Sequence, residues 1–218
     1  MVKIRPNTKH IFIWVPGTGG HEVHPAFKKA IESICKEPYQ ILCVYYPASW
    51  KLKFSVEAGI KATKDLIDEI SPQLDRNSQK LYMGGSSQGS WVLDDVLEDP
   101  VYSFFPDKAV LFGHPGTDST HLNSKFEGDD SIWEINDPKD TVTFGWGGKE
   151  QEIVEAFSKA QNGNVRAIFK VLGLAALHPI RLGRLLFLAV HHVGMIPWSN
   201  SPHDYSNQMP LAVYWLIN

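Results

Sequence analysis

The sequence predicts an α/β domain with a mostly parallel central sheet and helices on both of its faces. Short apolar runs alternate with segments whose apolar residues recur at helical spacing, and this order is typical of parallel strands joined by crossover helices. The chain has 218 residues, 43% of them hydrophobic and 21% charged, so it can bury the core of one domain. We therefore expect residues 1–218 to form a single three-layer domain.

The first part of the chain predicts three strands and two helices. Residues 10–16 and 40–46 are continuous apolar runs that end at or before a proline, and 80–84 is a third apolar stretch. A short helix is predicted over 25–34. A longer one is predicted over 55–70, where apolar side chains recur at helical spacing.

The rest of the chain begins with the same alternation and then changes. A helix is predicted over 88–98, followed by strands over 108–113 and 131–136. From about 150 to 198 the sequence is helical in pattern, which predicts a helical insertion between the last elements of the domain. The final stretch, 209–218, is predicted to be a helix in preference to a strand.

Charge, cysteine content and hydropathy exclude several classes of protein. A net charge of −3 gives no reason to expect nucleic acid or an anionic membrane as a partner. Two cysteines, Cys35 and Cys43, cannot form a disulfide framework and are expected to be reduced thiols. No run of about 18 uncharged apolar residues is present, and residues 1–10 lack the apolar core of a signal peptide.

The stretch GGSSQGS at 84–90 predicts a nucleophile. Gly85-Ser86-Ser87-Gln88-Gly89 fits the pattern G-x-S-x-G with Ser87 at its centre, between an apolar strand and a helix. Such a turn strains its central residue, and glycines flank it because side chains there would collide with the neighbouring strand or helix. A Ser/Gly-rich turn without chemistry is the alternative.

The tetrahedral anion formed by such a serine needs two N–H donors. One is expected from Gln88, at the start of the helix after Ser87, and the other from Thr18, in the glycine-rich loop that follows the first strand. A phosphate-binding loop would need a lysine after the last glycine of that loop, where the sequence has His21.

A serine nucleophile also needs a base that is oriented by an acid. Asp137 and Asp140 both follow the last predicted strand. Asp140 is preferred because Asp137 precedes a proline and can cap a turn. Of nine histidines, His203 is preferred as the base, since it stands in a polar loop before the final element.

Other histidines offer weaker sites. His114 and Asp118 form a rival pair in the segment GHPGTD. His21 and His24 form an H-x-x-H pair, but we find no further ligands at a suitable spacing and predict no metal.

Five stretches together resemble the cutinase-like branch of the α/β-hydrolases: WVPGTGG, YYPAS, GSSQG, NDPKD and PHDY. The similarity is greatest to the lysin B esterases of bacteriophages that infect mycobacteria. Those proteins carry a multi-helix insertion between the catalytic acid and histidine, the place that residues 150–198 occupy here. The chain departs from these families in having Ser86 where a tyrosine is usual, in lacking the cysteine pairs of secreted cutinases, and in being somewhat short for a lysin B.

The resemblance implies Ser87 as nucleophile, Asp140 as acid, His203 as base, and Thr18 and Gln88 as oxyanion-hole residues. It implies hydrolysis of the ester between mycolic acids and arabinogalactan in the host cell wall during phage lysis, with no cofactor. Such an enzyme would remain in the host cytoplasm until lysis and then act at the envelope, and we expect a monomer.

Three alternatives remain open at this point. The chain could be a general cutinase-like carboxylesterase or lipase, or an acyltransferase, which shares the acyl-enzyme chemistry. It could also be a non-catalytic cell-wall-binding protein on the same scaffold, because a fold does not determine a function.

Overall fold

The computed structural model describes residues 2–49, 52–114, 130–136, 166 and 204–218. In this part, the strands form one parallel sheet in the order β2-β1-β3-β4-β5. The strands are β1 (His10–Val15), β2 (Tyr39–Cys43), β3 (Lys80–Ser86), β4 (Lys108–Phe112) and β5 (Ile132–Ile135).

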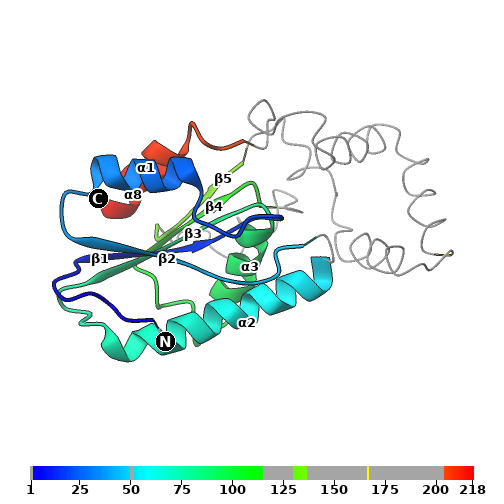
Figure 1. Cartoon of the computed structure of the whole chain (residues 1–218), viewed down its shortest axis with the longest axis horizontal. Helices are drawn as coiled ribbons and strands as arrows, with labels where there is room; N and C mark the ends of the chain where they lie inside the picture. Colours follow the sequence, from blue (N-terminus) through cyan, green and yellow to red (C-terminus); the bar gives the residue numbers. More distant parts are fainter. Residues whose placement is uncertain (1, 50–51, 115–129, 137–165, 167–203) are drawn as a thin grey trace.

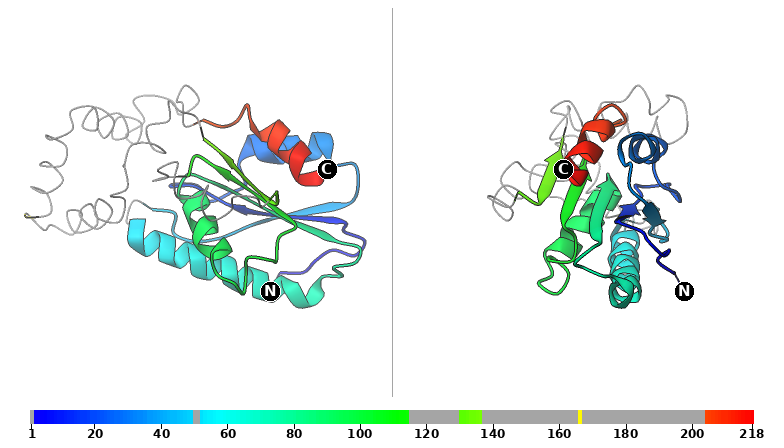
Figure 2. Two further views of the ribbon diagram at one scale, coloured as in Figure 1. Left: turned by 180° about the vertical axis from the view of Figure 1, so that it is seen from behind. Right: turned by 90° about the vertical axis from the view of Figure 1, so that its left-hand side faces the viewer.

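Helices cover both faces of this sheet and complete a three-layer α/β sandwich. The α1 and α8 helices pack together on one face, and α2 and α3 pack together on the other (Figures 1 and 2). Their bounds are α1 (Pro25–Ile34), α2 (Leu52–Ile70), α3 (Gln88–Leu97) and α8 (Met209–Ile217), with a short 3-10 helix at Ser71–Gln73 after α2. The predicted fold class is confirmed.

Two apolar cores explain why the strands are continuous apolar runs rather than alternating ones. In β1, Ile11, Ile13 and Val15 join the core beneath α2 and α3, while Phe12 and Trp14 join the core beneath α1 and α8. Successive side chains of a strand point to opposite faces, so both faces of β1 are buried.

The predicted elements agree with the structure except at some ends. Strand β2 ends at Cys43 instead of residue 46, although the Val44 N–H still donates to the Trp14 carbonyl at 2.9 Å. Tyr46 leaves the sheet and donates its hydroxyl to the Pro16 carbonyl at 2.5 Å. Helix α2 begins three residues earlier than predicted, and the C-terminal segment is helical as predicted. The insertion predicted at 150–198 lies outside the described residues except for Arg166.

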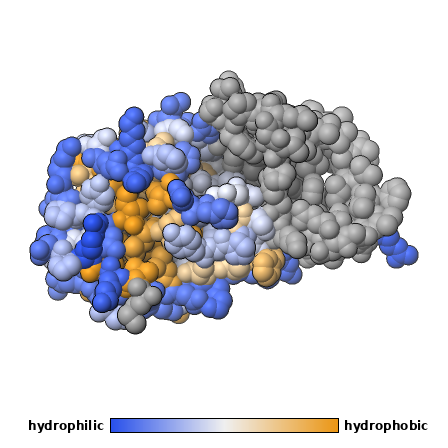
Figure 3. Space-filling model, viewed as in Figure 1, coloured by the Kyte–Doolittle hydropathy of each residue, from blue (hydrophilic) through white to orange (hydrophobic). Residues whose placement is uncertain are grey.

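Strand β2 forms one edge of the described sheet. All five of its residues are half-buried, and Figure 3 shows apolar surface gathered in a band over this region. Cys43 lies in this strand and Cys35 follows α1, and both are free thiols. Burial raises the pKa of Cys43 to about 11. None of the helices that the structure describes is long and apolar enough to cross a membrane.

Candidate active site

Ser87 occupies a strained turn between β3 and α3. Its backbone angles are φ 53° and ψ −121°, and only one other non-glycine residue in the described ranges, Asn7, has a positive φ. A backbone held in such a region costs about 1–3 kcal/mol and is found most often at functional sites. Ser87 stands at the N-cap of α3, yet its side chain makes no capping hydrogen bond. Its hydroxyl is therefore not committed to the helix end.

The glycines on either side of Ser87 are required by close backbone contacts. A β-carbon on Gly85 would lie 2.6 Å from the carbonyl oxygen of Gly89. A β-carbon on Gly89 would overlap the carbonyl oxygen of Val15 and lie 2.7 Å from that of Pro16. The first collision is with α3 and the second with the end of β1, which confirms the steric reason predicted from the G-x-S-x-G pattern.

Backbone and side-chain hydrogen bonds attach this turn to β4. The N–H of Ser87 donates to the Phe112 carbonyl at 2.8 Å. The fully buried Ser90 hydroxyl lies 2.8 Å from the Gly85 carbonyl oxygen and 2.9 Å from that of Phe112. The third serine of GGSSQGS therefore stabilises the turn, a role that the motif alone did not reveal.

The loop after β1 lies directly against the Ser87 turn. A β-carbon on Gly17 would meet the Ser86 carbonyl oxygen at 2.8 Å and the Ser87 Cβ at 3.2 Å. Gly19, with φ +77°, donates its N–H to the Ala48 carbonyl at 2.5 Å. Thr18, between these two glycines, is half-buried, as is Ser87. The structure thus brings the predicted oxyanion loop to the predicted nucleophile.

Gln88 begins α3 immediately after Ser87. The first N–H groups of a helix have no partner within the helix, and they favour negative charge near its N-terminus. The Gln88 side chain is buried, with 1% exposure, and points away from solvent into contacts with α2 and the segment before it. These side-chain contacts fix the position of the first residue of α3.

The predicted acid and base, Asp140 and His203, lie outside the described residues, as does the alternative acid Asp137. The chain resumes just after His203. Tyr205 is buried, and its ring centroid lies 6.2 Å from that of Phe112, the residue whose carbonyl accepts from the Ser87 N–H. The segment that follows His203 is thus packed at the carboxyl end of β4, next to the Ser87 turn.

His114 lies beside an acidic residue that the sequence did not point to. Its Nε2 lies 3.4 Å from Oδ2 of Asp94 on α3, and both side chains are largely buried. Its backbone N–H donates to the Asn136 side-chain oxygen at 3.1 Å, next to the segment that carries the candidate acids. Asp118 lies outside the described residues.

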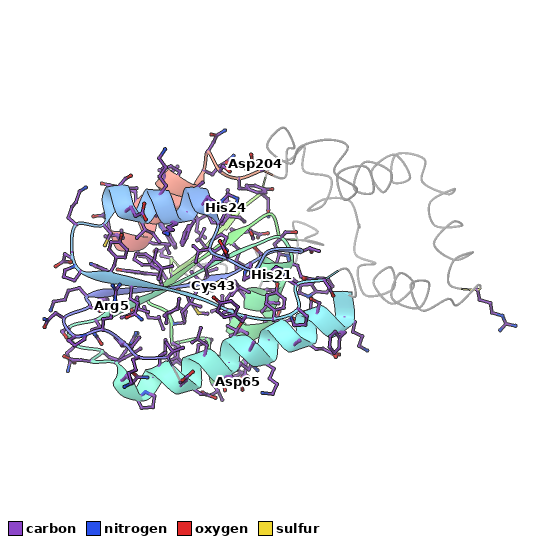
Figure 4. All side chains as sticks on the ribbon, viewed as in Figure 1. Arg5, His21, His24, Cys43, Asp65 and Asp204 are labelled. Atoms are coloured by element: carbon purple, nitrogen blue, oxygen red, sulfur yellow. The ribbon has the colours of Figure 1, made fainter. Side chains whose placement is uncertain are left out.

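His24 serves as the N-cap of α1. Its Nδ1 accepts from the Ala26 N–H at 3.3 Å, and its ring lies 6.2 Å from that of Trp14. Burial lowers the pKa of His24, and the Asp204 carboxylate partly offsets this effect. Figure 4 shows His24 just before α1 and Asp204 just before α8, on the same side of the sheet. Within the described ranges, no group of three or more His, Cys, Asp or Glu side chains is arranged to hold a metal.

The sequence matches no protein-family model and no curated protein. Among solved structures, the chain is similar to lysin B from Mycobacteriophage D29, with a TM-score of 0.60, 16% identity, and coverage of 97% of this chain and 100% of that one. A cutinase-like protein from Cryptococcus sp. has a TM-score of 0.47 and 14% identity, covering 74% of this chain and 93% of that one. The catalytic core domain of acetyl xylan esterase from Trichoderma reesei has a TM-score of 0.46 and 16% identity, covering 72% of this chain and 100% of that one. The likeness to lysin B, together with the parallel sheet and its covering helices, shows that this chain has the same fold as that protein, a three-layer α/β sandwich.

Proposed function

We propose that this protein is a serine esterase that acts through an acyl-enzyme on Ser87. The observation that carries the proposal is the strained turn at Ser87, with the Gly17 loop packed against it. Strain of this kind is retained where it serves chemistry, and no capping role accounts for the Ser87 hydroxyl. In this proposal, Asp140 is the acid, His203 the base, and the N–H groups of Thr18 and Gln88 form the oxyanion hole.

The position of Tyr205 supports His203 as the base. Tyr205 packs on Phe112 of β4, and the Phe112 carbonyl accepts from the Ser87 N–H, so the chain two residues after His203 lies beside the strand to which the Ser87 turn is bonded. Two residues span at most about 7 Å. This reach is consistent with an imidazole placed at the Ser87 hydroxyl.

The reaction then proceeds in two steps. His203, oriented by Asp140, takes the proton from the Ser87 hydroxyl as its oxygen bonds to the ester carbonyl carbon, and the N–H groups of Thr18 and Gln88 stabilise the resulting anion. The C–O bond to the alcohol breaks, and His203 gives its proton to the departing oxygen. Water, deprotonated by His203, attacks the acyl-enzyme and releases the acid and the free serine.

For the substrate, we propose the ester that joins mycolic acids to arabinogalactan in the host cell wall. The resemblance of the motifs to those of lysin B supports this choice, and the fold similarity to lysin B over 97% of the chain is consistent with it. The enzyme would then act at the cell envelope after the host membrane is breached during phage lysis.

The test compares wild type with Ser87→Ala on two kinds of substrate. Nitrophenyl esters of increasing acyl length report ester hydrolysis, and isolated mycolyl-arabinogalactan reports the proposed natural substrate by release of mycolic acid. We expect wild type to hydrolyse both, and Ser87→Ala to lose turnover by several orders of magnitude. Ser86→Ala, the same change one residue earlier in the same turn, is the matched control and should keep turnover of the same order.

The outcomes separate the alternatives. Hydrolysis of short esters without release of mycolic acid would indicate a general carboxylesterase. Absence of hydrolysis on every ester, in a folded protein, would indicate a binding protein on a hydrolase scaffold and would contradict the proposal.

A further inference from the structure

Ser55, on the first turns of α2, lies at the centre of a buried hydrogen-bond network. Its side chain has no exposed surface. Its hydroxyl oxygen accepts from the Ser49 N–H at 2.9 Å and lies 2.6 Å from the Pro47 carbonyl oxygen. The single proton of the same hydroxyl faces a second, more distant acceptor, Oε1 of Gln88 at 3.2 Å, which shares it with the Pro47 carbonyl. One hydroxyl therefore connects α2, the segment after β2, and the residue that follows the nucleophile.

The Gln88 amide completes a closed set of contacts with the same segment. Its Nε2 donates to the Ser49 carbonyl at 3.1 Å, while its Oε1 faces the Ser55 hydroxyl. The opposite orientation of the amide would place Oε1 against the Ser49 carbonyl oxygen, two acceptors without a proton between them. The side chain is thus held in one orientation, and it fixes the start of α3 relative to the segment after β2.

The segment after β2 also holds the loop on the other side of the nucleophile. The Ala48 carbonyl accepts from the Gly19 N–H at 2.5 Å, and the Tyr46 hydroxyl donates to the Pro16 carbonyl at 2.5 Å. Thr18 is adjacent to Gly19. Residues 46–49 therefore contact both the loop that carries Thr18 and the side chain of Gln88.

We infer that Ser55 is a positioning residue for the oxyanion hole. The inference rests on the proposed function, in which Thr18 and Gln88 supply the two N–H donors. Ser55 joins the two donor-bearing segments through Ser49 and Gln88, so it sets the separation of the donors without touching the substrate. Donors that stabilise a transition state must be preorganised, and displacements of about 1 Å lower rates strongly.

Removal of the Ser55 hydroxyl should therefore lower the rate of reaction and leave substrate binding nearly unchanged. In Ser55→Ala, the Ser49 N–H, the Pro47 carbonyl and the Gln88 Oε1 all lose a buried partner, so the segments that they belong to can shift apart. We expect kcat to fall about tenfold or more, with KM within about twofold of wild type. The affinity for a trifluoromethyl ketone, whose adduct with Ser87 carries an anionic oxygen in the hole, should fall by the same factor as kcat/KM.

Thr63 offers a matched control on the same helix. Its hydroxyl is also fully buried and donates to the Gly59 carbonyl at 2.8 Å, but it has no contact with residues 46–49 or with Gln88 among the described hydrogen bonds. Thr63→Val removes a buried hydroxyl from the same helix and should leave kcat and the ketone affinity unchanged. If Ser55 contributed to stability alone, both variants would keep the wild-type kcat and ketone affinity.

A second variant tests the network from its other side. Gln88→Met keeps the backbone N–H and the length of the side chain and removes only the amide. Gln88→Met should lower kcat and the ketone affinity as Ser55→Ala does. The double variant should be no less active than the less active of the two single variants, because both substitutions interrupt one network.

Two results would overturn the inference. One is Ser55→Ala matching Thr63→Val in kcat and in ketone affinity; the other is full additivity of Ser55→Ala and Gln88→Met. Either result, with an active wild type and an inactive Ser87→Ala, leaves the proposed esterase intact and removes only the role of Ser55. An inactive wild type would remove the proposed function itself.

Discussion

A β-carbon added to Gly17 would lie 3.2 Å from the Cβ of Ser87, so the loop after β1 is packed against the proposed nucleophile. The same carbon would lie 2.8 Å from the Ser86 carbonyl oxygen. This contact is too short, and only a shift of the backbone would relieve it. Glycine at this position therefore allows the loop that carries Thr18 to approach the turn. This approach is the geometric condition for a two-donor oxyanion hole.

Substitution of Gly17 by alanine should displace that loop and weaken catalysis. We expect Gly17→Ala to lower kcat by about 10²-fold, the loss typical of removing one oxyanion donor, with a smaller change in KM. Steady-state kinetics on a nitrophenyl ester measure both constants. Wild-type kcat in a folded Gly17→Ala protein would show that the loop does not take part in the reaction.

The two candidate acids can be separated by paired substitutions. Asp140→Asn should lower kcat by about 10⁴-fold, because an amide cannot hold the base in the correct tautomer. Asp137→Asn should keep activity within several-fold of wild type, since its expected role is to cap a turn before a proline. If only Asp137→Asn abolishes activity, the assignment of Asp140 is wrong.

The two candidate bases should respond differently to substitution. His203→Ala should abolish turnover. His114→Asn should keep most of the turnover and lower the free energy of unfolding by about 1–3 kcal/mol, because it removes an imidazole that lies 3.4 Å from the largely buried Asp94 carboxylate. Urea unfolding and esterase assays on both variants give the comparison. Loss of activity in His114→Asn to the level of His203→Ala would assign the base to His114.

His24 should make the stability of the protein fall in mildly acidic solution. Burial lowers the pKa of His24 in the folded protein below its ordinary value of 6.5, so the unfolded chain binds this proton at a higher pH than the folded one. Its contribution to stability is therefore complete above about pH 6.5 and is lost as the pH falls towards the lowered pKa. Protonation of Nδ1 would also remove the acceptor of the Ala26 N–H.

The control for this effect is His24→Asn, because asparagine caps helices well and does not titrate. Urea midpoints at about pH 7.5 and about pH 5 should differ less in the variant than in wild type. An equal difference in the two proteins would show that His24 is not the group responsible.

The strained turn was predictable because its signal is local. Five consecutive residues, an apolar strand before them and a helix after them identify Ser87, and the collisions at Gly85 and Gly89 supply the reason for the glycines. Strands β1, β3 and β4 were also predicted closely, since each is a continuous apolar run buried on both faces.

The supporting contacts of the site were not predictable from the sequence. Ser55 and Gln88 are 33 residues apart, and Gln88 and Ser49 are 39 apart, so only the packing of α2 against α3 brings them together. The end of β2 also depends on a distant contact. Tyr46 is apolar enough to continue a strand, but it leaves the sheet and its hydroxyl donates to the Pro16 carbonyl. Asp94, which lies 3.4 Å from His114, likewise comes from a distant part of the chain, on α3.

The most direct test of the account is the site of covalent labelling by a fluorophosphonate probe, located by mass spectrometry of the digested protein. We predict a single adduct on Ser87, retained in Ser86→Ala and absent in Ser87→Ala. A folded wild-type protein that stays unlabelled, or an adduct that persists in Ser87→Ala, would contradict the assignment of Ser87 as the nucleophile.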